Sequence, residues 1–318
     1  MIARPDIDGL LAGPLGRWLE EQALVREQAR ALAKARWWKA ATIGGPLVLF
    51  LWIAVPQWTQ FNMFATAGAA GLGFAWGNAP RARAIRTVKD GINSAIARAI
   101  GLTYTIDVSP GRPFQLACDY GLLPGHDRAN CEDGWQGDLG GHSFALHEAC
   151  LQERQQSGKT TRFVTVFRGS IISIDYARDF HGTTLVERAD RHRSFFGGRK
   201  ESIVLEGKRL DFVDMVHPGF DDDFCVFSND QVEARYLIHP EYVERLMAVQ
   251  TAFAGKDIRA IFDAGDLVIV VETENLFESG SIEARDDRGR IVRTVEQFAS
   301  LTDLAQTLNE RERGQAAP

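Results

Sequence analysis

The chain has 318 residues, of which 45% are hydrophobic and 25% are charged, a composition typical of a globular protein with one or two domains. The formal net charge of −6 is unevenly distributed: residues 1–99 carry 12 Lys and Arg against 6 Asp and Glu, and residues 100–318 carry 24 against 36. The acidic C-terminal part would be repelled by nucleic acid and by an anionic membrane surface, so neither is expected as its partner.

The first predicted element is a helix near the N-terminus. In residues 17–38 (RWLEEQALVREQARALAKARWW), Leu24, Ala31 and Ala35 form a weakly apolar side among many charges. This pattern predicts a cytoplasmic amphipathic helix that continues into the apolar residues after it. Residues 1–39 are therefore expected to form a cytoplasmic N-terminal segment.

Residues 40–79 are predicted to form a transmembrane helical hairpin, with the lipid bilayer as its partner. The runs 42–58 and 61–79 contain no charged residue, and each is about as long as a bilayer-spanning helix. Five of the seven tryptophans lie within residues 37–76, as expected for residues at a membrane interface. A buried hairpin in a soluble protein is the alternative, but uncharged runs of this length are rare in soluble helices.

Basic residues flank the predicted hairpin on both outer sides, whereas the link between its two helices has none. They are Lys34, Arg36 and Lys39 before the hairpin and Arg81, Arg83, Arg86 and Lys89 after it. By the positive-inside rule, both ends of the hairpin face the cytoplasm. The sequence thus predicts a multi-pass membrane protein whose N- and C-termini are cytoplasmic.

Small residues recur in the second apolar run. Ala67, Gly71 and Ala75 lie four residues apart on one face of the predicted helix, and Gly73 and Gly77 do so on another face. Small residues at this spacing let two helices approach closely. The sequence leaves two interpretations open: packing within the hairpin, and a homo-oligomer formed through Ala67, Gly71 and Ala75.

A connector helix over residues 80–101 is predicted to lead from the hairpin to a single domain over residues 102–310, followed by a polar tail over residues 311–318. The connector has apolar residues at spacings of three and four, which is the helical period. These residues are Ile85, Val88, Ile92, Ile96 and Ile100.

The domain combines short strands with helices. Stretches rich in β-branched and aromatic residues predict the strands. They are 163–177, 183–189, 202–207, 223–228 and 258–273, the last divided into two strands at Asp263-Ala264-Gly265. A closing helix is predicted from the spacing of Val295, Phe298, Leu301, Leu304 and Leu308. The expected fold class is α+β, with a mixed, mainly antiparallel sheet and packed helices.

The stretch SNDQVEARYLIHPEYVERL, residues 228–246, predicts two short helices after a strand. Asp230 is a good N-cap, and Glu233 three residues later completes the pattern of a capping box. Pro240 suits the first position of the second helix, and Gly255 ends it. Glu233 and Arg235 point to different sides, so each is expected to pair with another part of the chain. A structural ion pair that anchors the turn is the main interpretation, and partner recognition is the alternative.

Several stretches occur in the order found in a known family. They are VFRG (166–169), DFHGTT (179–184), FCVFSNDQVEARYLIHPEYVERL (224–246) and NLFE (275–278), with GLLPGHDRANCEDGWQG (121–137) and FALHEACL (144–151) upstream. Over roughly residues 100–310 the chain resembles the bacterial DUF3137 family of uncharacterised proteins. The resemblance implies a bacterial protein with paired hydrophobic segments ahead of its domain, so the expected membrane is the inner membrane. It implies no activity, ligand or catalytic residue.

No metal site and no cofactor are predicted. The four cysteines lie at irregular spacings without a CxxC pair, and among His126, Cys131, His142, His147 and Cys150 only an HxxC spacing occurs. The acidic run 221–223 lacks the spaced ligand loop that calcium uses. The stretch SGKTT (157–161) has Glu153 where a phosphate-binding loop requires a glycine. The residues before it, QERQQ (152–156), are interpreted as the end of a polar helix and not as the end of a strand.

No catalytic residue is predicted either, because the sequence has no GxSxG nucleophile motif. Asp175, Asp179 and His181 lie close together in the sequence, so His181 could act as a base oriented by a carboxylate. We favour the interpretation of His181 as a turn residue. The alternative requires a pocket that gathers these residues, with or without Arg235.

The main functional hypothesis is therefore a membrane-anchored cytoplasmic domain that binds a protein or small-molecule partner. The residues proposed to carry this binding are Asp230, Glu233, Arg235 and Tyr236. An enzyme acting on a membrane-associated substrate through carboxylate and histidine chemistry is the second hypothesis. A structural membrane protein that self-associates is the third.

Overall fold

The computed structural model describes residues 7–139, 141–157, 160–175, 180–189, 191, 200–215, 224–277 and 283–315. The chain divides into two compact units. The hairpin unit contains residues 6–93 and 278–291, and the sheet domain contains residues 94–277 and 292–318. The chain thus leaves the hairpin unit, forms most of the sheet domain, and returns to the hairpin unit before its last helix.

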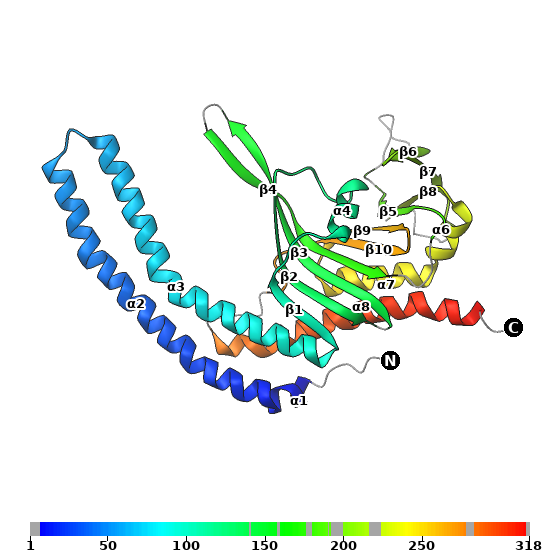
Figure 1. Cartoon of the computed structure of the whole chain (residues 1–318), viewed down its shortest axis with the longest axis horizontal. Helices are drawn as coiled ribbons and strands as arrows, with labels where there is room; N and C mark the ends of the chain where they lie inside the picture. The colour runs from blue at the N-terminus through cyan, green and yellow to red at the C-terminus, as the bar shows by residue number, and fades with distance from the viewer. Residues whose placement is uncertain are drawn as a thin grey trace. The chain divides into compact units, whose positions relative to one another are not determined.

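The helices and strands follow one another as labelled in Figure 1. The hairpin unit contains α1 (Ile7–Ala12), α2 (Pro14–Ala54), most of α3 (Thr59–Ala99), the 3-10 helix η1 (Ala284–Asp286) and the start of α8 (Asp287–Gln315). The sheet domain contains the helices α4 (Arg112–Asp119), α6 (Gln231–Leu237) and α7 (Pro240–Ala252) and the rest of α8. Its strands are β1 (Leu102–Asp107), β2 (Arg128–Leu139), β3 (His142–Ser157), β4 (Thr160–Asp175), β5 (Thr184–Arg188), β6 (Ser202–Leu205), β7 (Lys208–Val213), β8 (Phe224–Ser228), β9 (Lys256–Asp263) and β10 (Asp266–Glu272).

Helices α2 and α3 form a long antiparallel hairpin, drawn in blue and cyan in Figure 1. Small residues of α3 let bulky residues of α2 approach closely. A Cβ atom at Gly77 would lie 2.9 Å from Nε1 of Trp37, and one at Gly91 would lie 2.1 Å from the Trp18 ring. The glycine face of α3 therefore packs within the hairpin. The predicted segment boundaries at residues 39/40 and 79/80 fall inside continuous helices.

The other small-residue face of α3 is exposed. Ala67 and Ala75 are exposed, and a Cβ atom at Gly71 would meet no other atom within 4 Å. This face is therefore not used in the packing of the hairpin. Self-association through Ala67, Gly71 and Ala75 stays a prediction.

A proline inside α3 is compensated by an arginine of α2. Pro80 has no N–H group, so the carbonyl oxygen of Trp76, four residues earlier, loses its helical donor. Nη1 of Arg36 donates to this oxygen at 3.2 Å, and the guanidinium group lies 5.2 Å from the centre of the Trp76 ring. A basic residue that sequence analysis assigned to orientation thus also satisfies the backbone at the proline.

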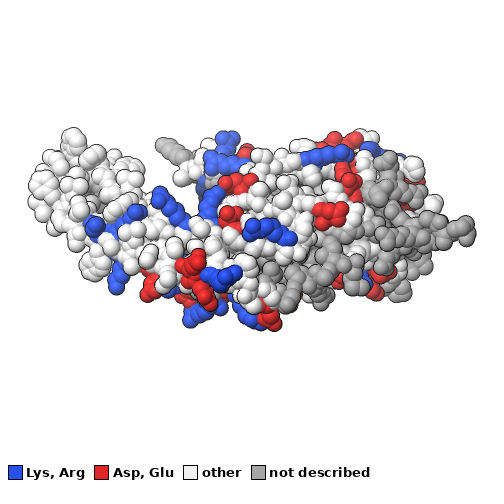
Figure 2. All heavy atoms as spheres, turned by 60° about the horizontal axis from the view of Figure 1, so that its bottom comes forward, with Lys and Arg blue, Asp and Glu red and all other residues white. Residues whose placement is uncertain are grey.

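The end of the hairpin is covered by exposed apolar side chains without a charge, and Figure 2 shows it as a white surface at the left. The large exposed side chains there are Ile43, Leu47, Leu49, Phe50, Trp52, Ile53, Trp58, Phe61, Met63, Phe64, Leu72, Phe74 and Trp76. Among the described helices, only α2 is long and apolar enough to cross a membrane by length and composition. The predicted second span is not confirmed, because the run in α3 is rich in Gly and Ala, which are less hydrophobic than Leu or Ile.

Within the hairpin unit, a buried ion pair joins α2 to the first turn of α8, which lies far from α2 in the sequence. Nη1 and Nη2 of Arg26 donate to the two carboxylate oxygens of Asp287 at 3.0 and 2.7 Å. The two side chains are only 2% and 6% exposed. Arg30 forms a longer, exposed pair with Glu283 at 3.7 Å. The first turn of α8 is therefore held to α2 by charge as well as by packing.

The sheet domain contains a ten-stranded sheet with the order β1-β2-β3-β4-β10-β9-β5-β8-β7-β6. The α+β class is confirmed, and all described strand pairs are antiparallel, whereas a mixed sheet was expected. The predicted hairpin at Asp263-Ala264-Gly265 joins β9 to β10, with φ angles of 50° at Ala264 and 85° at Gly265. These two strands insert between β4 and β5, in the centre of the sheet.

Helices cover both faces of the sheet. On one face, Phe298 of α8 packs against Trp135 and Phe144, with ring centres 4.6 and 6.1 Å apart. Tyr242 of α7 packs on Phe262 of β9. On the other face, α4 packs on β4 and β10. The buried core on that side includes Ala117, Leu151, Phe167, Ile171, Val268 and Val270.

Strands β1, β2 and β3 were not predicted, and one part of β3 was predicted wrongly. Residues 152–156, QERQQ, were interpreted as the end of a polar helix, but they pair with β4 as far as Ser157↔Thr160. Beyond Gln152 this ribbon has only two strands, and most of its side chains are exposed. With no buried face, it shows no alternation of apolar and polar residues.

His147 of β3 is buried, 7% exposed, and its Nε2 atom has no hydrogen-bond partner among the described residues. Burial lowers its pKa from 6.5 to about 4. Because the unfolded chain binds this proton more readily than the folded chain, we expect the free energy of unfolding to fall as the pH falls from 6.5 to 4. The loss is at most about 3 kcal/mol. Denaturant titrations of the full chain at pH values from 8 to 4 measure this dependence. In His147→Leu the free energy of unfolding should no longer fall with pH in this way; an unchanged pH dependence would contradict the assignment.

Candidate functional site

The stretch at residues 228–237 is joined to the turn at residues 181–183. The carboxylate of Glu233 accepts hydrogen bonds from the backbone N–H groups of His181 and Gly182, at 3.0 and 2.7 Å. Asp230 caps α6 by accepting from the N–H groups of Val232 and Glu233, both at 3.0 Å. The N-cap prediction is confirmed. The capping-box prediction is wrong for Glu233, whose carboxylate binds the distant turn instead of the N–H of Asp230.

Gly182 allows this joint because a side chain at its position would not fit. A Cβ atom there would lie 2.8 Å from both Oδ1 of Asn229 and Cβ of Asp230. Oδ1 of Asn229 also accepts from the N–H of Thr183 at 2.7 Å. Residues 181–183 and the stretch SNDQVEARY therefore form two halves of one hydrogen-bonded joint. Among the described residues, Glu233 anchors this joint through backbone amides and not through an ion pair.

A polar network continues from this joint. Nζ of Lys208 donates to Oδ1 of Asp263 at 2.7 Å, to Oγ1 of Thr183 at 2.9 Å and to the hydroxyl of Tyr120 at 2.8 Å. Desolvation lowers the pKa of Lys208, but its hydrogen bonds to Asp263 and Tyr120 outweigh this and raise it. Burial raises the pKa of Asp263, but hydrogen bonds from Lys208 and Thr183 outweigh this and lower it. Both charges are thus stabilised, and the network fixes the turn on the sheet.

The four residues proposed for binding differ in what they contact. Asp230 and Glu233 hold the joint, as described above. Arg235 is exposed, and its Nε donates to the carbonyl oxygen of Asp214 at 3.3 Å. Tyr236 is half-buried beside it. Whether these residues bind a partner stays a prediction.

Of the residues in the enzyme hypothesis, those that the structure describes lie on the surface. Asp175, at the end of β4, and His181 are both exposed. Asp179, the run 221–223 and Lys159 of the SGKTT stretch lie outside the described residues. The pocket described below is lined by neither Asp175 nor His181.

A pocket of about 460 Å³ lies where β4, β9 and β10 meet. It is lined by Thr165, Val166, Phe167, Arg168, Ala254, Lys256, Glu272, Thr273 and Glu274. Arg168 and Lys256 bring positive charges, and Glu272 and Glu274 bring negative ones. Two of these charges are paired with each other, since Nζ of Lys256 lies 3.9 Å from Oε1 of Glu272. Sequence analysis singled out VFRG as a motif but did not predict that Arg168 lines a pocket.

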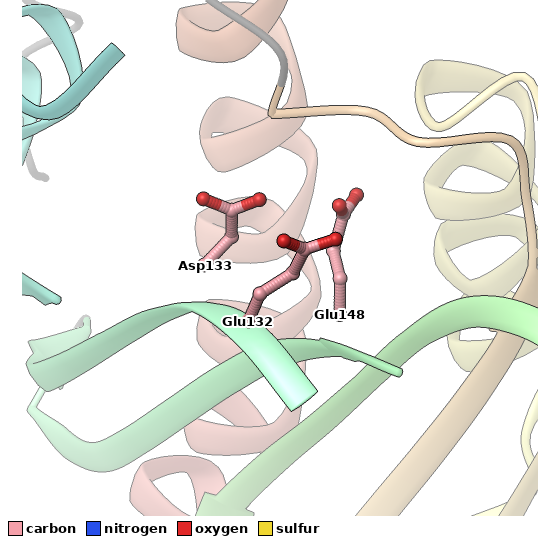
Figure 3. Close-up of side chains that lie close together, drawn as sticks. All are labelled: Glu132, Asp133 and Glu148. Atoms are coloured by element: carbon pink, nitrogen blue, oxygen red, sulfur yellow. The ribbon is translucent and has the colours of Figure 1, made fainter. Parts of the chain in front are cut away.

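Three carboxylates that sequence reasoning missed lie together on the face that α8 covers. One oxygen each from Glu132, Asp133 and Glu148 lies within 4.8 Å of the others. Figure 3 shows the three side chains rising from neighbouring strands toward the same space. Tyr104 donates its hydroxyl to Asp133, and the N–H of Leu276 donates to Glu148 at 2.7 Å.

An irregularity in β2 produces this arrangement. Glu132 and Glu148 are direct partners across β2 and β3, so their side chains share a face. The register shifts between Glu132 and Trp135, and Asp133 has a φ of 56°. In a regular strand Asp133 would point to the opposite face, but the bulge turns it toward Glu132. The one signal in the sequence is the acidic pair followed by glycine in CEDGWQG.

Comparison with solved structures finds a weak similarity to the crystal structure of the mycobacterial trehalose monomycolate transport factor A, TtfA. The sequences are 12% identical, the TM-score is 0.34, and the alignment covers 68% of this chain and 93% of the other. A similarity of this size carries no argument about function. No curated protein matches the sequence.

The sequence of the sheet domain matches a family described as "Protein of unknown function (DUF3137)" over residues 165–310. The match begins one residue before VFRG and includes DFHGTT and SNDQVEARY, the stretches that contain the hydrogen-bonded joint. The upstream stretches at residues 121–151 lie outside it, so that part of the resemblance stays a prediction. The expected resemblance to the DUF3137 family is thus confirmed by a match over residues 165–310.

Proposed function

We propose that the protein is a binding module anchored at the bacterial inner membrane. In this proposal α2 and α3 both cross the bilayer, and the sheet domain binds a partner in the cytoplasm. The observation that carries the proposal is the uncharged end of the hairpin, where many large apolar side chains are exposed (Figure 2). A soluble protein rarely exposes so large an apolar patch.

The orientation follows from the charges. Basic residues flank the apolar part of both helices, and the link at residues 55–58 has none. The basic side is expected in the cytoplasm. Two crossings place the sheet domain on the same side as the N-terminus, whereas a single crossing by α2 would place it on the other side.

Helix α6 is the proposed binding surface. Asp230 and Glu233 fix the helix through backbone hydrogen bonds, so its outer residues are held in place. Val232, 80% exposed, and Arg235 lie on that outer side, with Tyr236 half-buried next to them. An exposed apolar residue beside an arginine and a tyrosine is the composition that protein interfaces favour.

Thiol labelling in intact bacterial cells tests the anchoring. A membrane-impermeant maleimide should label Gln57→Cys, in the link between α2 and α3, and should not label Glu20→Cys or the half-buried native Cys118 and Cys150 until the cells are lysed. Labelling of Cys118 in intact cells would show a single crossing. Labelling of none before lysis and release of the protein by alkaline carbonate would show a protein that does not insert.

Crosslinking in native membranes tests the binding surface. We expect the full chain to capture a discrete partner, and Arg235→Ala to lose it while remaining folded by circular dichroism. Arg245→Ala on α7 is the control, because the Arg245 side chain is 42% exposed and its ion pair among the described residues is with Glu241 four residues earlier. Equal capture by both variants would exclude α6 as the binding surface.

A further inference from the structure

The pocket at the end of β10 opens along the edge of β4. Four consecutive residues of β4, Thr165–Arg168, line it, together with Glu272–Glu274. Successive side chains of a strand point to opposite faces of the sheet, so a pocket that contacts four in a row lies beside the strand and not above one face. The pairing of β10 with β4 ends at Gly169, after which the N–H of Thr273 donates to the carbonyl oxygen of Arg168 at 3.0 Å. The pocket therefore lies where a longer β10 would continue.

Along this pocket β4 has an edge that pairs with no other described strand. In this part of β4 the described strand partner is β3 alone, and Figure 1 shows the two strands continuing together. Val166 is passed over even in that pairing, which runs from Phe167 directly to Thr165. Bulges of this kind interrupt strand pairing and often lie beside active sites. Among the described residues, the backbone of β4 at the pocket is thus open to pairing with an added extended chain.

Arg168 brings to the pocket a positive charge that no carboxylate among the described residues neutralises. Its side chain donates from Nη2 to Sγ of Cys150 at 3.6 Å, which is a long contact with a weak acceptor. Lys256, by contrast, is paired with Glu272. A guanidinium group presents several donors in a fixed fork that matches the two oxygens of a carboxylate. Arg168 thus has donors left to hold the carboxylate of a ligand.

The other charges and the volume of the pocket decide which carboxylate fits. Glu272 and Glu274 line the same pocket, so they would repel a nucleotide or another polyanion. The volume of about 460 Å³ lies within the range of roughly 300–1,000 Å³ that is typical of small-molecule sites. A few residues of peptide fit such a volume, and a folded domain does not. A peptide chain end supplies both parts that the pocket requires, because its single carboxylate is attached directly to an extended backbone.

We propose that this pocket binds the carboxyl end of an extended peptide, which lies along the edge of β4 and places its terminal carboxylate at Arg168. Hydrogen bonds between the two backbones give affinity that does not depend on the peptide sequence, and Arg168 selects the chain end. All nine lining residues lie within residues 165–310, the part of the chain that matches the family. The site shares no residue with the binding surface proposed on α6.

Tripeptide libraries test this proposal on the full chain in detergent. The probes are an equimolar mixture of tripeptides with free C-termini and the same mixture with amidated C-termini. Saturation-transfer NMR should detect binding of the free acids, and the amides should bind at least about tenfold more weakly, because a hydrogen-bonded charge pair is lost. Methylation of one of the two inner amide nitrogens of the peptides should also weaken binding, since it removes a backbone donor.

Two variants of β4 separate this site from peptide binding elsewhere. Arg168→Gln should abolish the preference for free acids over amides and leave the Tm unchanged, because the described contact of the Arg168 side chain is the long one with Cys150. Arg162→Gln, exposed on the same strand and outside the pocket lining, is the matched control and should bind as the unaltered protein does. If Arg168→Gln does not fold, the comparison of free acids with amides on the unaltered protein decides alone.

Each other outcome overturns the proposal. If neither library gives a signal, the pocket binds no peptide. If free acids and amides bind equally, or if the preference for free acids persists in Arg168→Gln, Arg168 does not hold the carboxylate. If single amino acids or the N-methylated peptides bind as tightly as the tripeptides, the ligand does not pair with the edge of β4.

Discussion

Arg26→Ala is expected to detach the first turn of α8 from α2, with a loss of about 3–5 kcal/mol in the stability of that contact. The substitution leaves the carboxylate of Asp287, only 6% exposed, without the two hydrogen bonds it receives from Arg26. Because each 1.4 kcal/mol is a factor of ten, amide hydrogen exchange in residues 283–291 should accelerate by at least about a hundredfold. Mass spectrometry of the full chain in nanodiscs measures this segment directly.

Two controls show that burial of the pair causes the effect. Arg30→Ala removes the exposed pair with Glu283, for which we expect less than about 1 kcal/mol. Arg26→Met combined with Asp287→Leu should recover most of the stability, because a well-packed apolar pair can replace a buried ion pair. Rapid exchange in the double variant but not in Arg26→Ala would contradict the account.

Gly169→Ala is expected to destabilise the sheet domain by about 3 kcal/mol or more. A Cβ atom at Gly169 would lie 2.1 Å from the carbonyl oxygen of Val271 and 2.7 Å from the Phe167 ring. The first clash is with the backbone of β10 in the centre of the sheet, so no side-chain rotation relieves it. This contact explains why the VFRG stretch has a glycine at this position.

The labelling rate of a buried cysteine measures this loss of stability in the sheet domain separately from the hairpin unit. Cys225 is fully buried in β8, so its reaction with a thiol reagent requires the sheet domain to open. Its labelling should accelerate by at least about a hundredfold in Gly169→Ala. Gly125→Ala is the control, because a Cβ atom there meets no atom within 4 Å. Equal rates in the two variants would show that β10 shifts to accommodate the methyl group.

The features that were predictable from the sequence are those with local causes. Asp230 capping α6, Pro240 starting α7 and the turn at Ala264-Gly265 each depend on a few neighbouring residues, and all were correct. The partner of Glu233 was not predictable, because the turn at His181 lies 52 residues away and binds through its backbone. No side-chain pattern reports such a contact.

The carboxylate cluster escaped prediction for a different reason. Glu132 and Glu148 meet only because β2 and β3 pair in one register, and Asp133 joins them only because of the bulge. Strand β3 was itself not predicted, since His147, buried on one face, and Glu148, buried on the other, interrupt the alternation of apolar and polar residues. A site whose residues are brought together by strand register can be recognised only once the pairing of the strands is known.

The pairing of Arg26 with Asp287 sets an order of events during synthesis. The two residues are 261 positions apart in the chain. At about 5–20 residues per second, Arg26 leaves the ribosome roughly ten to fifty seconds before Asp287 does. The contact between α2 and the first turn of α8 can therefore form only after almost the whole sheet domain has been translated. A chain that stops before residue 287 cannot form this contact, which distinguishes an incomplete protein from a finished one.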